Sequence, residues 1–120
     1  MTGRHDGLGN VEDIVLSHGG NLVRMREALR CFKEQFGLWP TTLALGGESL
    51  ASIRDNHLTQ LGYARLAERM RIVSQIKHNQ IVATDDDGNQ FHYGHDPIWE
   101  AQRRVTTDEV DQWVWGISLD

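Results

Sequence analysis

The spacing of apolar residues between Leu22 and Phe36 constrains the fold of this chain more than any other feature. Large apolar residues recur there at intervals of three and four positions: Leu22, Met25, Leu29, Phe32 and Phe36. At about 100° per residue they lie within an arc of about 80°, which predicts one buried stripe on an amphipathic helix. Asn21 is the expected N-cap, Gly37 the expected end, and Cys31 falls opposite the stripe, at the expected surface. Such a stripe has to pack against a second apolar layer.

Short segments with strand-like patterns supply that second layer. Thr41–Leu45 alternates between polar and apolar positions, and Ile72–Ile76 is a further candidate strand. Gln80–Thr84 and Gln90–Tyr93 resemble the two arms of a hairpin, because the residues between them, Asp-Asp-Asp-Gly-Asn, favour a tight turn. We therefore predict an α+β fold, in which a small, mainly antiparallel sheet of about three or four strands is packed by one long amphipathic helix and several short helices.

The starts of the short helices are marked by residues that cap free backbone N–H groups. Asn10 and Thr59 precede two of them, and Asp96 precedes a third, with Pro97 at its first helical position. Thr106 stands at capping-box spacing ahead of the last helix. The expected ranges are Val11–His18, Glu48–Asn56, Gln60–Arg71, Pro97–Arg104 and a last helix from about Thr106, whose end is open because residues 113–117 also fit a strand.

The length of 120 residues fits one domain with one core. Residues 1–10 contain three glycines and are expected to be a flexible lead-in, and residues 11–120 are expected to form the single globular domain. The one cysteine, Cys31, cannot form an internal disulfide, which fits a reducing compartment. No apolar run approaches the roughly 20 residues of a membrane helix, and residues 1–10 lack the apolar segment of a secretory signal. We therefore expect a cytoplasmic protein without a membrane partner.

Acidic and basic residues are segregated along the chain. Residues 1–84 carry ten Lys and Arg against eight Asp and Glu, whereas residues 85–120 carry two Arg against nine Asp and Glu. The last third is therefore strongly acidic, and the net charge is −5 at pH 7. A distribution of this kind produces a one-sided electrostatic field, which steers basic partners and argues against general binding to nucleic acid.

Tryptophans accompany the acidic residues of this last third. Trp side chains are enriched in binding hot spots, and acidic rims orient a basic partner and speed its association. We therefore expect a non-enzymatic protein-interaction module whose partner has a basic surface. The expected partner-binding residues are Asp85, Asp86, Asp87, Trp99, Asp108, Glu109, Asp111, Trp113 and Trp115. The alternative is that these tryptophans close the hydrophobic core, as large aromatic side chains usually do.

Size and charge alone suggest one concrete form of this module. Small acidic inhibitors made by phages and mobile elements, such as anti-CRISPR proteins, cover a nucleic-acid-binding surface with carboxylates in place of phosphates. The chain has the size and acidity for such a role, and it carries no motif of such a family.

A second hypothesis is a small metal-dependent enzyme. His92, His95 and Asp96, with the Asp85–Asp87 loop and His78, have side chains that bind zinc or a harder cation. Their spacing matches no known metal motif, and the carboxylates of the loop are also typical turn residues. No glycine-rich phosphate loop and no activated nucleophile is present, so we expect no catalytic residue, metal or cofactor.

A third hypothesis is binding to nucleic acid through a basic face. The helix pair expected within Glu48–Arg71 has the outline of a helix-turn-helix, and it would present Arg65, Arg69 and Arg71. A second basic row, on one flank of the long helix, consists of Arg26, Arg30 and Lys33. The net negative charge argues against both surfaces.

Overall fold

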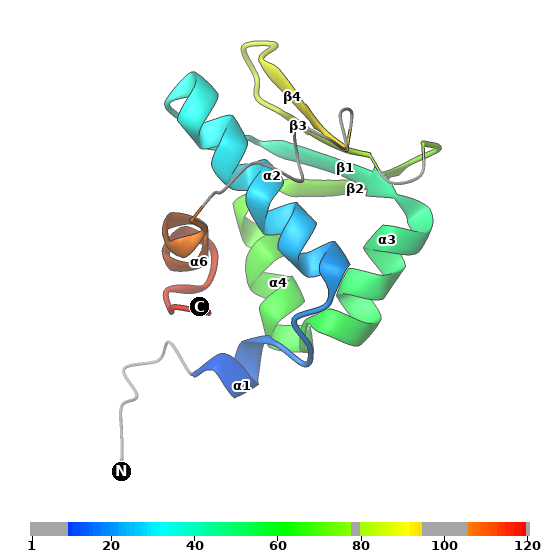
Figure 1. Cartoon of the computed structure of the whole chain (residues 1–120), viewed down its shortest axis with the longest axis vertical. Helices are drawn as coiled ribbons and strands as arrows, with labels where there is room; N and C mark the ends of the chain where they lie inside the picture. The colour runs from blue at the N-terminus through cyan, green and yellow to red at the C-terminus, as the bar shows by residue number, and fades with distance from the viewer. Residues whose placement is uncertain (1–9, 78–79, 95–105, 120) are drawn as a thin grey trace.

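The computed structural model describes residues 10–77, 80–94 and 106–119. Figure 1 shows a layer of helices packed against a small sheet. In chain order the elements are α1 (Val11–Ile14), α2 (Gly20–Phe36), β1 (Thr42–Gly46), α3 (Gly47–Ser52), the π-helix η1 (Ile53–His57), α4 (Gln60–Arg69), β2 (Arg71–Gln75), β3 (Ile81–Thr84), β4 (Gln90–Tyr93) and α6 (Asp108–Trp115). The predicted α+β class is confirmed.

The four strands form one sheet in the order β2-β1-β3-β4. β1 and β2 are parallel, while β1–β3 and β3–β4 are antiparallel, so the predicted mainly antiparallel sheet and its hairpin are confirmed. The candidate strand at Ile72–Ile76 is also present, shifted by one residue. It runs parallel to β1 because the α3–η1–α4 segment between the two strands returns the chain to the end of the sheet at which β1 begins, as a parallel connection requires.

The register of the strands gathers apolar side chains on one face of the sheet. Two rows run across β1, β3 and β4: Leu43, Ala83 and Phe91 in one, and Leu45, Ile81 and Tyr93 in the other. All of these except Phe91 are buried in one core cluster, and Phe91 packs against it. The opposite face, with Ala44, Val82 and His92, is partly or fully exposed within the described part of the chain.

Helix α2 is covered by more than one layer, which explains a wrong expectation. α2 contacts β3 and β4 of the sheet, and α6 and η1 also contact it. Its buried residues therefore extend well beyond the predicted stripe, and Cys31 is 2% exposed instead of lying at the surface. The predicted end is confirmed, since Gly37 adopts a left-handed conformation (φ 81°), but the helix starts after Gly19, and Asn21 is inside it.

The short helices differ from their predicted ranges where contacts with distant residues determine the helix ends. The predicted Asn10 cap of α1 is confirmed, and Asp13 completes a capping box, but the helix ends at Ile14 because Val15 forms an antiparallel bridge with Leu58. The helix that starts after β1 continues as a π-helix to His57, and the expected Thr59 cap of α4 is present. α6 starts after Thr107, which makes no capping hydrogen bond from its side chain, so the cap predicted at Thr106 is wrong by one residue.

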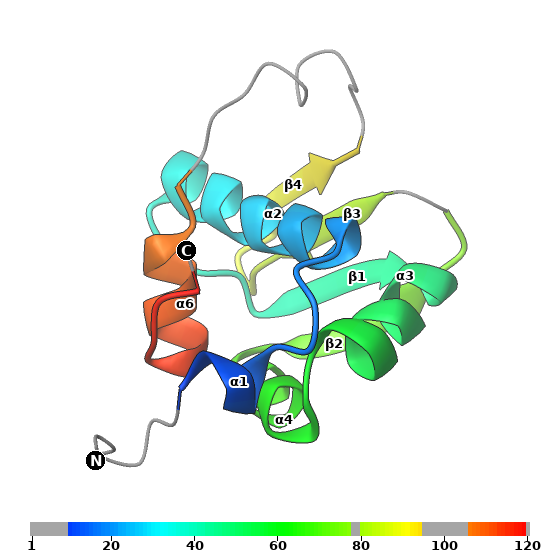
Figure 2. The same cartoon turned by 60° about the horizontal axis from the view of Figure 1, so that its bottom comes forward.

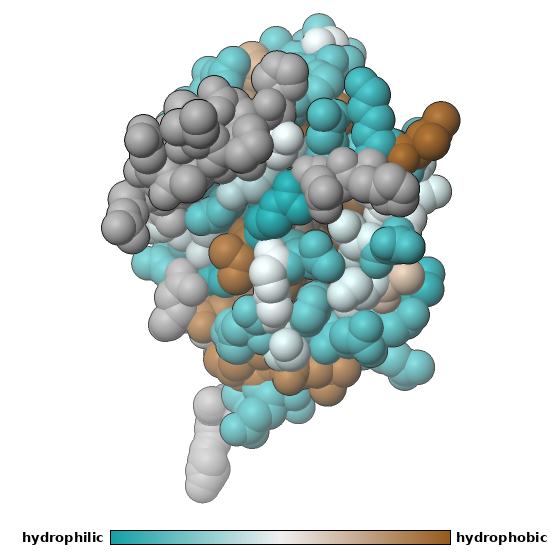
Figure 3. Space-filling view, turned by 45° about the vertical axis from the view of Figure 1, so that its right-hand side comes forward, coloured by the Kyte–Doolittle hydropathy of each residue, from teal (hydrophilic) through white to brown (hydrophobic). Residues whose placement is uncertain are grey.

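α6 and α3 lie at opposite ends of the helical layer in both Figure 1 and Figure 2. In the space-filling view of Figure 3, hydrophilic side chains cover most of the visible face, and the apolar ones form separate groups. Among residues 10–77, 80–94 and 106–119, no helix has the length and apolar character needed to cross a bilayer.

Several predictions concern residues outside the described ranges. They include almost all of the expected lead-in 1–10, the helix expected at Pro97–Arg104, and the candidate residues His78, His95, Asp96 and Trp99.

Candidate functional site

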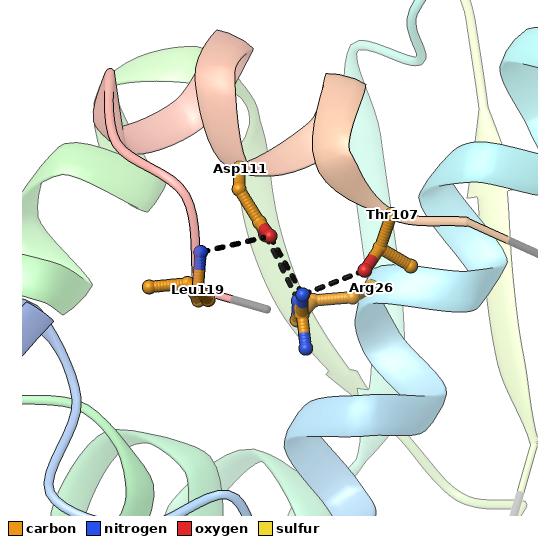
Figure 4. Close-up of polar contacts among 4 residues, drawn as sticks. All are labelled: Arg26, Thr107, Asp111 and Leu119. Carbon is orange, nitrogen blue, oxygen red and sulfur yellow. Dashed lines mark hydrogen bonds and ion pairs between the residues drawn. The ribbon is translucent and has the colours of Figure 1, made fainter.

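Helix α6 is fixed to α2 by a buried ion pair, shown in Figure 4. Arg26 Nε lies 2.9 Å from Asp111 Oδ1, and its Nη2 lies 2.6 Å from Asp111 Oδ2, a bidentate geometry. The same Nη2 donates to Thr107 Oγ1 at 2.6 Å, and the Leu119 backbone N–H donates to Asp111 Oδ2 at 3.4 Å. Burial raises the cost of separating such charges, so the pair sets the position of α6 and of the chain that follows it.

Two of the expected partner-binding residues therefore lie in the interior. Asp111 is fully buried against Arg26, and Trp115 is 1% exposed, so neither can contact a partner in this conformation. Trp115 Nε1 donates to the Gly62 carbonyl at 2.9 Å, which fixes α6 to α4. In this conformation Trp115 packs in the core and Asp111 neutralises Arg26, so neither side chain is at the surface where the sequence placed it.

Trp113 has a different position from Trp115, although the two are only two residues apart on α6. Its indole stacks on that of Trp39, with ring centroids 4.5 Å apart and an angle of 3° between the planes. Both side chains are half-buried. They line an open groove of about 570 Å³ together with Lys33, Asp108, Glu109 and Gln112. The groove is formed where the end of α2, the segment before β1 and the start of α6 meet.

The charges around this groove are partly compensated. Lys33 Nζ lies 5.4 Å from the centroid of the Trp39 ring and donates to the Gly37 carbonyl at 3.3 Å. Arg30 Nη2 lies 3.3 Å from Glu109 Oε1, a pair in which the glutamate side chain is 58% exposed. Asp108 is exposed, and no ion pair of this residue is found within the described part of the chain. The groove therefore combines aromatic surface with a carboxylate available to a partner.

The Asp85–Asp87 turn is connected to this groove by a short segment of chain. Thr41, two residues after Trp39, donates from Oγ1 to Asp86 Oδ1 at 3.2 Å and from its backbone N–H to the Thr84 carbonyl at 2.8 Å. These bonds place the acidic turn next to the segment that carries Trp39. The residues of the turn are not among those that line the groove, whereas Asp108 and Glu109 of α6 are.

Within the turn, Asp85 has a structural role. Its carboxylate accepts hydrogen bonds from the Asn89 side chain at 2.9 Å and from the backbone N–H groups of Asp87 and Asn89 at 2.9 and 3.0 Å. The bond from the Asn89 side chain, with these backbone bonds, lowers the pKa of the Asp85 carboxyl below its ordinary value. Asp86 and Asp87 are exposed and project their charge from the turn.

The residues of the metal hypothesis are only partly described. His92 is exposed on β4, with Nε2 3.2 Å from Gln90 Oε1. Within the described ranges, no three His, Cys, Asp or Glu side chains are arranged to hold a metal ion. His95 and Asp96 lie outside these ranges.

The basic residues of the nucleic-acid hypothesis do not form the expected rows. Arg26 is 3% exposed and paired with Asp111, so the row of Arg26, Arg30 and Lys33 is wrong as a surface. Arg65 Nη1 donates to the Trp115 carbonyl at 3.1 Å, directed toward α6. Arg71 is in strand β2 and not in the helix with Arg65 and Arg69. The second helix of the predicted helix-turn-helix is present as α4, with Arg69 exposed on it, but the three arginines do not form the predicted reading face.

A serine–histidine pair that the sequence did not indicate lies between α3 and η1. Ser52 Oγ is 3.2 Å from His57 Nε2. The imidazole lies directly against Gly19, where a Cβ atom would be 2.0 Å from His57 Cε1. The carbonyl of His57 accepts from Leu16 N–H at 2.8 Å. These contacts show His57 holding the α1–α2 connection against η1, which is a structural role.

Sequence reasoning missed Trp39, Lys33 and Gln112 as members of the groove. Nothing in the local pattern around Trp39 and Pro40 relates this tryptophan to Trp113. For Lys33, the sequence indicates only a basic residue on the flank of the long helix, four residues before Gly37.

No protein-family model, curated protein or solved structure matches the chain.

Proposed function

We propose that this protein is a non-enzymatic interaction module that binds a protein partner with a basic surface through the Trp39–Trp113 groove. The observation that carries the proposal is the stacked pair of half-buried tryptophans beside exposed carboxylates. The binding residues are Trp39, Trp113, Asp108 and Glu109, with Asp86 and Asp87 of the adjacent turn and Asp85 as its support. Trp99 remains a predicted member outside the described ranges.

Physical chemistry assigns different tasks to these groups. Indole rings contribute burial of apolar surface at low entropic cost, which makes tryptophan a frequent hot-spot residue. Exposed carboxylates at the rim raise the association rate and orient a basic partner, and their effect falls with ionic strength. The buried Arg26–Asp111 pair supports both, because it holds α6 in place against α2.

A narrower form of the proposal is an inhibitor of a nucleic-acid-binding protein, of the kind that phages and mobile elements make. The partner's basic surface would then be its nucleic-acid site, and the carboxylates would take the place of phosphates. We place this activity in the cytoplasm, since the buried Cys31 makes no disulfide. Support for this form comes from the net charge of −5 and from the acidic turn, which Thr41 joins to the segment that carries Trp39.

Charge reversal beside the groove tests the proposal. The tagged protein, its Asp87→Lys/Asp108→Lys variant and a Glu12→Lys/Glu48→Lys control are used to capture proteins from nuclease-treated lysate of the source cells. The control changes the net charge equally, and its Glu48 occupies the first turn of α3 as Asp108 does in α6. We expect a salt-sensitive partner that the wild type and the control retain and the Asp87/Asp108 variant loses. Equal retention by both variants would contradict the proposal.

Competition separates the narrower form from the broader one. Duplex DNA and RNA are added to the captured complex at constant ionic strength. If the partner's nucleic-acid site is covered, nucleic acid releases the protein and the protein inhibits nucleic-acid binding. A ternary complex of protein, partner and nucleic acid would exclude the inhibitor form and leave the interaction module.

A further inference from the structure

We propose that the groove selects an arginine side chain of the partner, in preference to lysine. This inference rests on the proposed function and specifies the group that the groove recognises. The groove is shallow and open to solvent, so a side chain of a partner can lie along it.

The groove already holds a cation of the protein itself. The Lys33 ammonium lies 5.4 Å from the centroid of Trp39, at a distance typical of a cation–π contact. Trp113 stacks on Trp39 at 4.5 Å, so Lys33 cannot lie between the two rings. Lys33 therefore covers the face of Trp39 that Trp113 does not cover, and it shows that a positive charge is stable against an indole at this site.

The remaining groups of the groove match a planar cation with several donors. Asp108 is an exposed carboxylate, and Gln112 adds an amide oxygen one helical turn further along the same side of α6. The two indoles are stacked face to face, so each offers only its outer face, and because Lys33 lies over Trp39, the outer face of Trp113 is the flat surface on which a ligand would stack. A guanidinium stacks on such a surface and donates two N–H bonds to one carboxylate, whereas an ammonium is a point charge that does neither as well.

The local ion pair makes this selection possible without an excess of free negative charge. Arg30 compensates Glu109, which leaves Asp108 as the carboxylate to receive the incoming cation. Recognition through geometry then adds to the general attraction of an acidic surface, which by itself does not distinguish arginine from lysine.

Two peptides of equal charge test the inference. Binding of nona-arginine and nona-lysine to the full chain is measured by calorimetry, and the indole N–H signals of Trp39 and Trp113 are followed by NMR. We expect nona-arginine to bind about tenfold more tightly and to shift both indole signals. The Trp39→Leu variant should lose this preference and retain most of its nona-lysine affinity. Trp113→Leu repeats the test from the other ring if the first variant does not fold.

The outcomes distinguish this inference from the proposed function. Equal affinity for both peptides, reduced by Asp108→Asn and unaffected by Glu48→Gln, would overturn arginine selection and leave the acidic docking surface intact. A preference for arginine that persists unchanged in both tryptophan variants would also overturn the inference, because residues other than Trp39 and Trp113 would then cause the preference. Absence of binding to both peptides overturns the inference, and the capture experiment with charge-reversed variants decides the proposed function separately.

Discussion

Arg26 and Asp111 keep their charges inside the protein, with side chains 4% and 0% exposed. Neither residue type is ordinarily buried unless it is paired, and here each satisfies the other through two hydrogen bonds. The sequence pattern does not reveal the pairing, because it predicts both residues as surface charges of two separate segments. A contact between α2 and α6 depends on the tertiary arrangement, which no local pattern encodes.

Removing one member of this pair is expected to be costly. Asp111→Ala leaves an uncompensated guanidinium in the interior and should lower the free energy of unfolding by about 3–5 kcal/mol. The double variant Arg26→Met/Asp111→Leu removes both charges and should recover most of that loss. Urea denaturation measures all three proteins. A loss below about 1 kcal/mol for the single variant would show that the pair is not desolvated as described.

The Asp85 carboxyl gives a prediction for pH dependence. Its pKa is lowered in the folded protein, chiefly by the hydrogen bond from the Asn89 side chain. The stabilisation of the turn is therefore complete above the ordinary aspartate pKa of about 3.9 and is lost as the pH falls through the lower folded value. Carboxyl NMR titration should give a higher midpoint for Asp85 in the Asn89→Ala variant than in the wild type. The same midpoint in both proteins would contradict the assigned cause.

At the scale of elements, the sequence predicted those segments whose structure depends on local pattern. The periodic stripe placed α2, the turn residues 85–89 placed the β3–β4 hairpin, and Thr59 placed the start of α4. Prediction failed where contacts with a distant segment determine the end of a helix or the burial of a side chain. α1 is shorter than expected because Val15 pairs with Leu58, and Cys31 is buried because α2 is covered on more than one side. The η1 π-helix has no signature in the sequence.

The close packing of α1 on α4 makes a further prediction at this scale. A Cβ atom at Gly62 would lie 2.3 Å from the Ile14 carbonyl oxygen, a backbone atom that cannot move without displacing α1. Gly62→Ala should therefore destabilise the protein by about 1–3 kcal/mol, although alanine normally favours a helix. Gly20→Ala in α2 is the matched control, since nothing lies within 4 Å of its added Cβ, and it should be neutral or slightly stabilising. Thermal unfolding of the two variants compares them; equal stability would argue against the α1–α4 contact.

At the scale of the whole molecule, the sequence marked the acidic residues of the candidate site and one of its two tryptophans. Charge counts alone marked Asp85–Asp87, Asp108 and Glu109, because net charge is a property of the sequence. The choice between Trp113 and Trp115 required the orientation of α6, which the buried ion pair and the bond from Trp115 to Gly62 determine. Only the structure shows that Trp39 belongs to the candidate site, because its indole stacks on that of Trp113.

The central claim is that a protein partner contacts this molecule at the Trp39–Trp113 groove. Site-specific photo-crosslinking in the source cells tests it most directly. A photoreactive amino acid replaces Gln112, which is exposed and lines the groove, or Glu48, which is exposed in α3 at the other end of the helical layer. We predict one dominant crosslinked protein from the Gln112 position, lost on Asp87→Lys/Asp108→Lys, and none from Glu48. The same crosslinked product from both positions, or a product from Glu48 alone, would contradict the account.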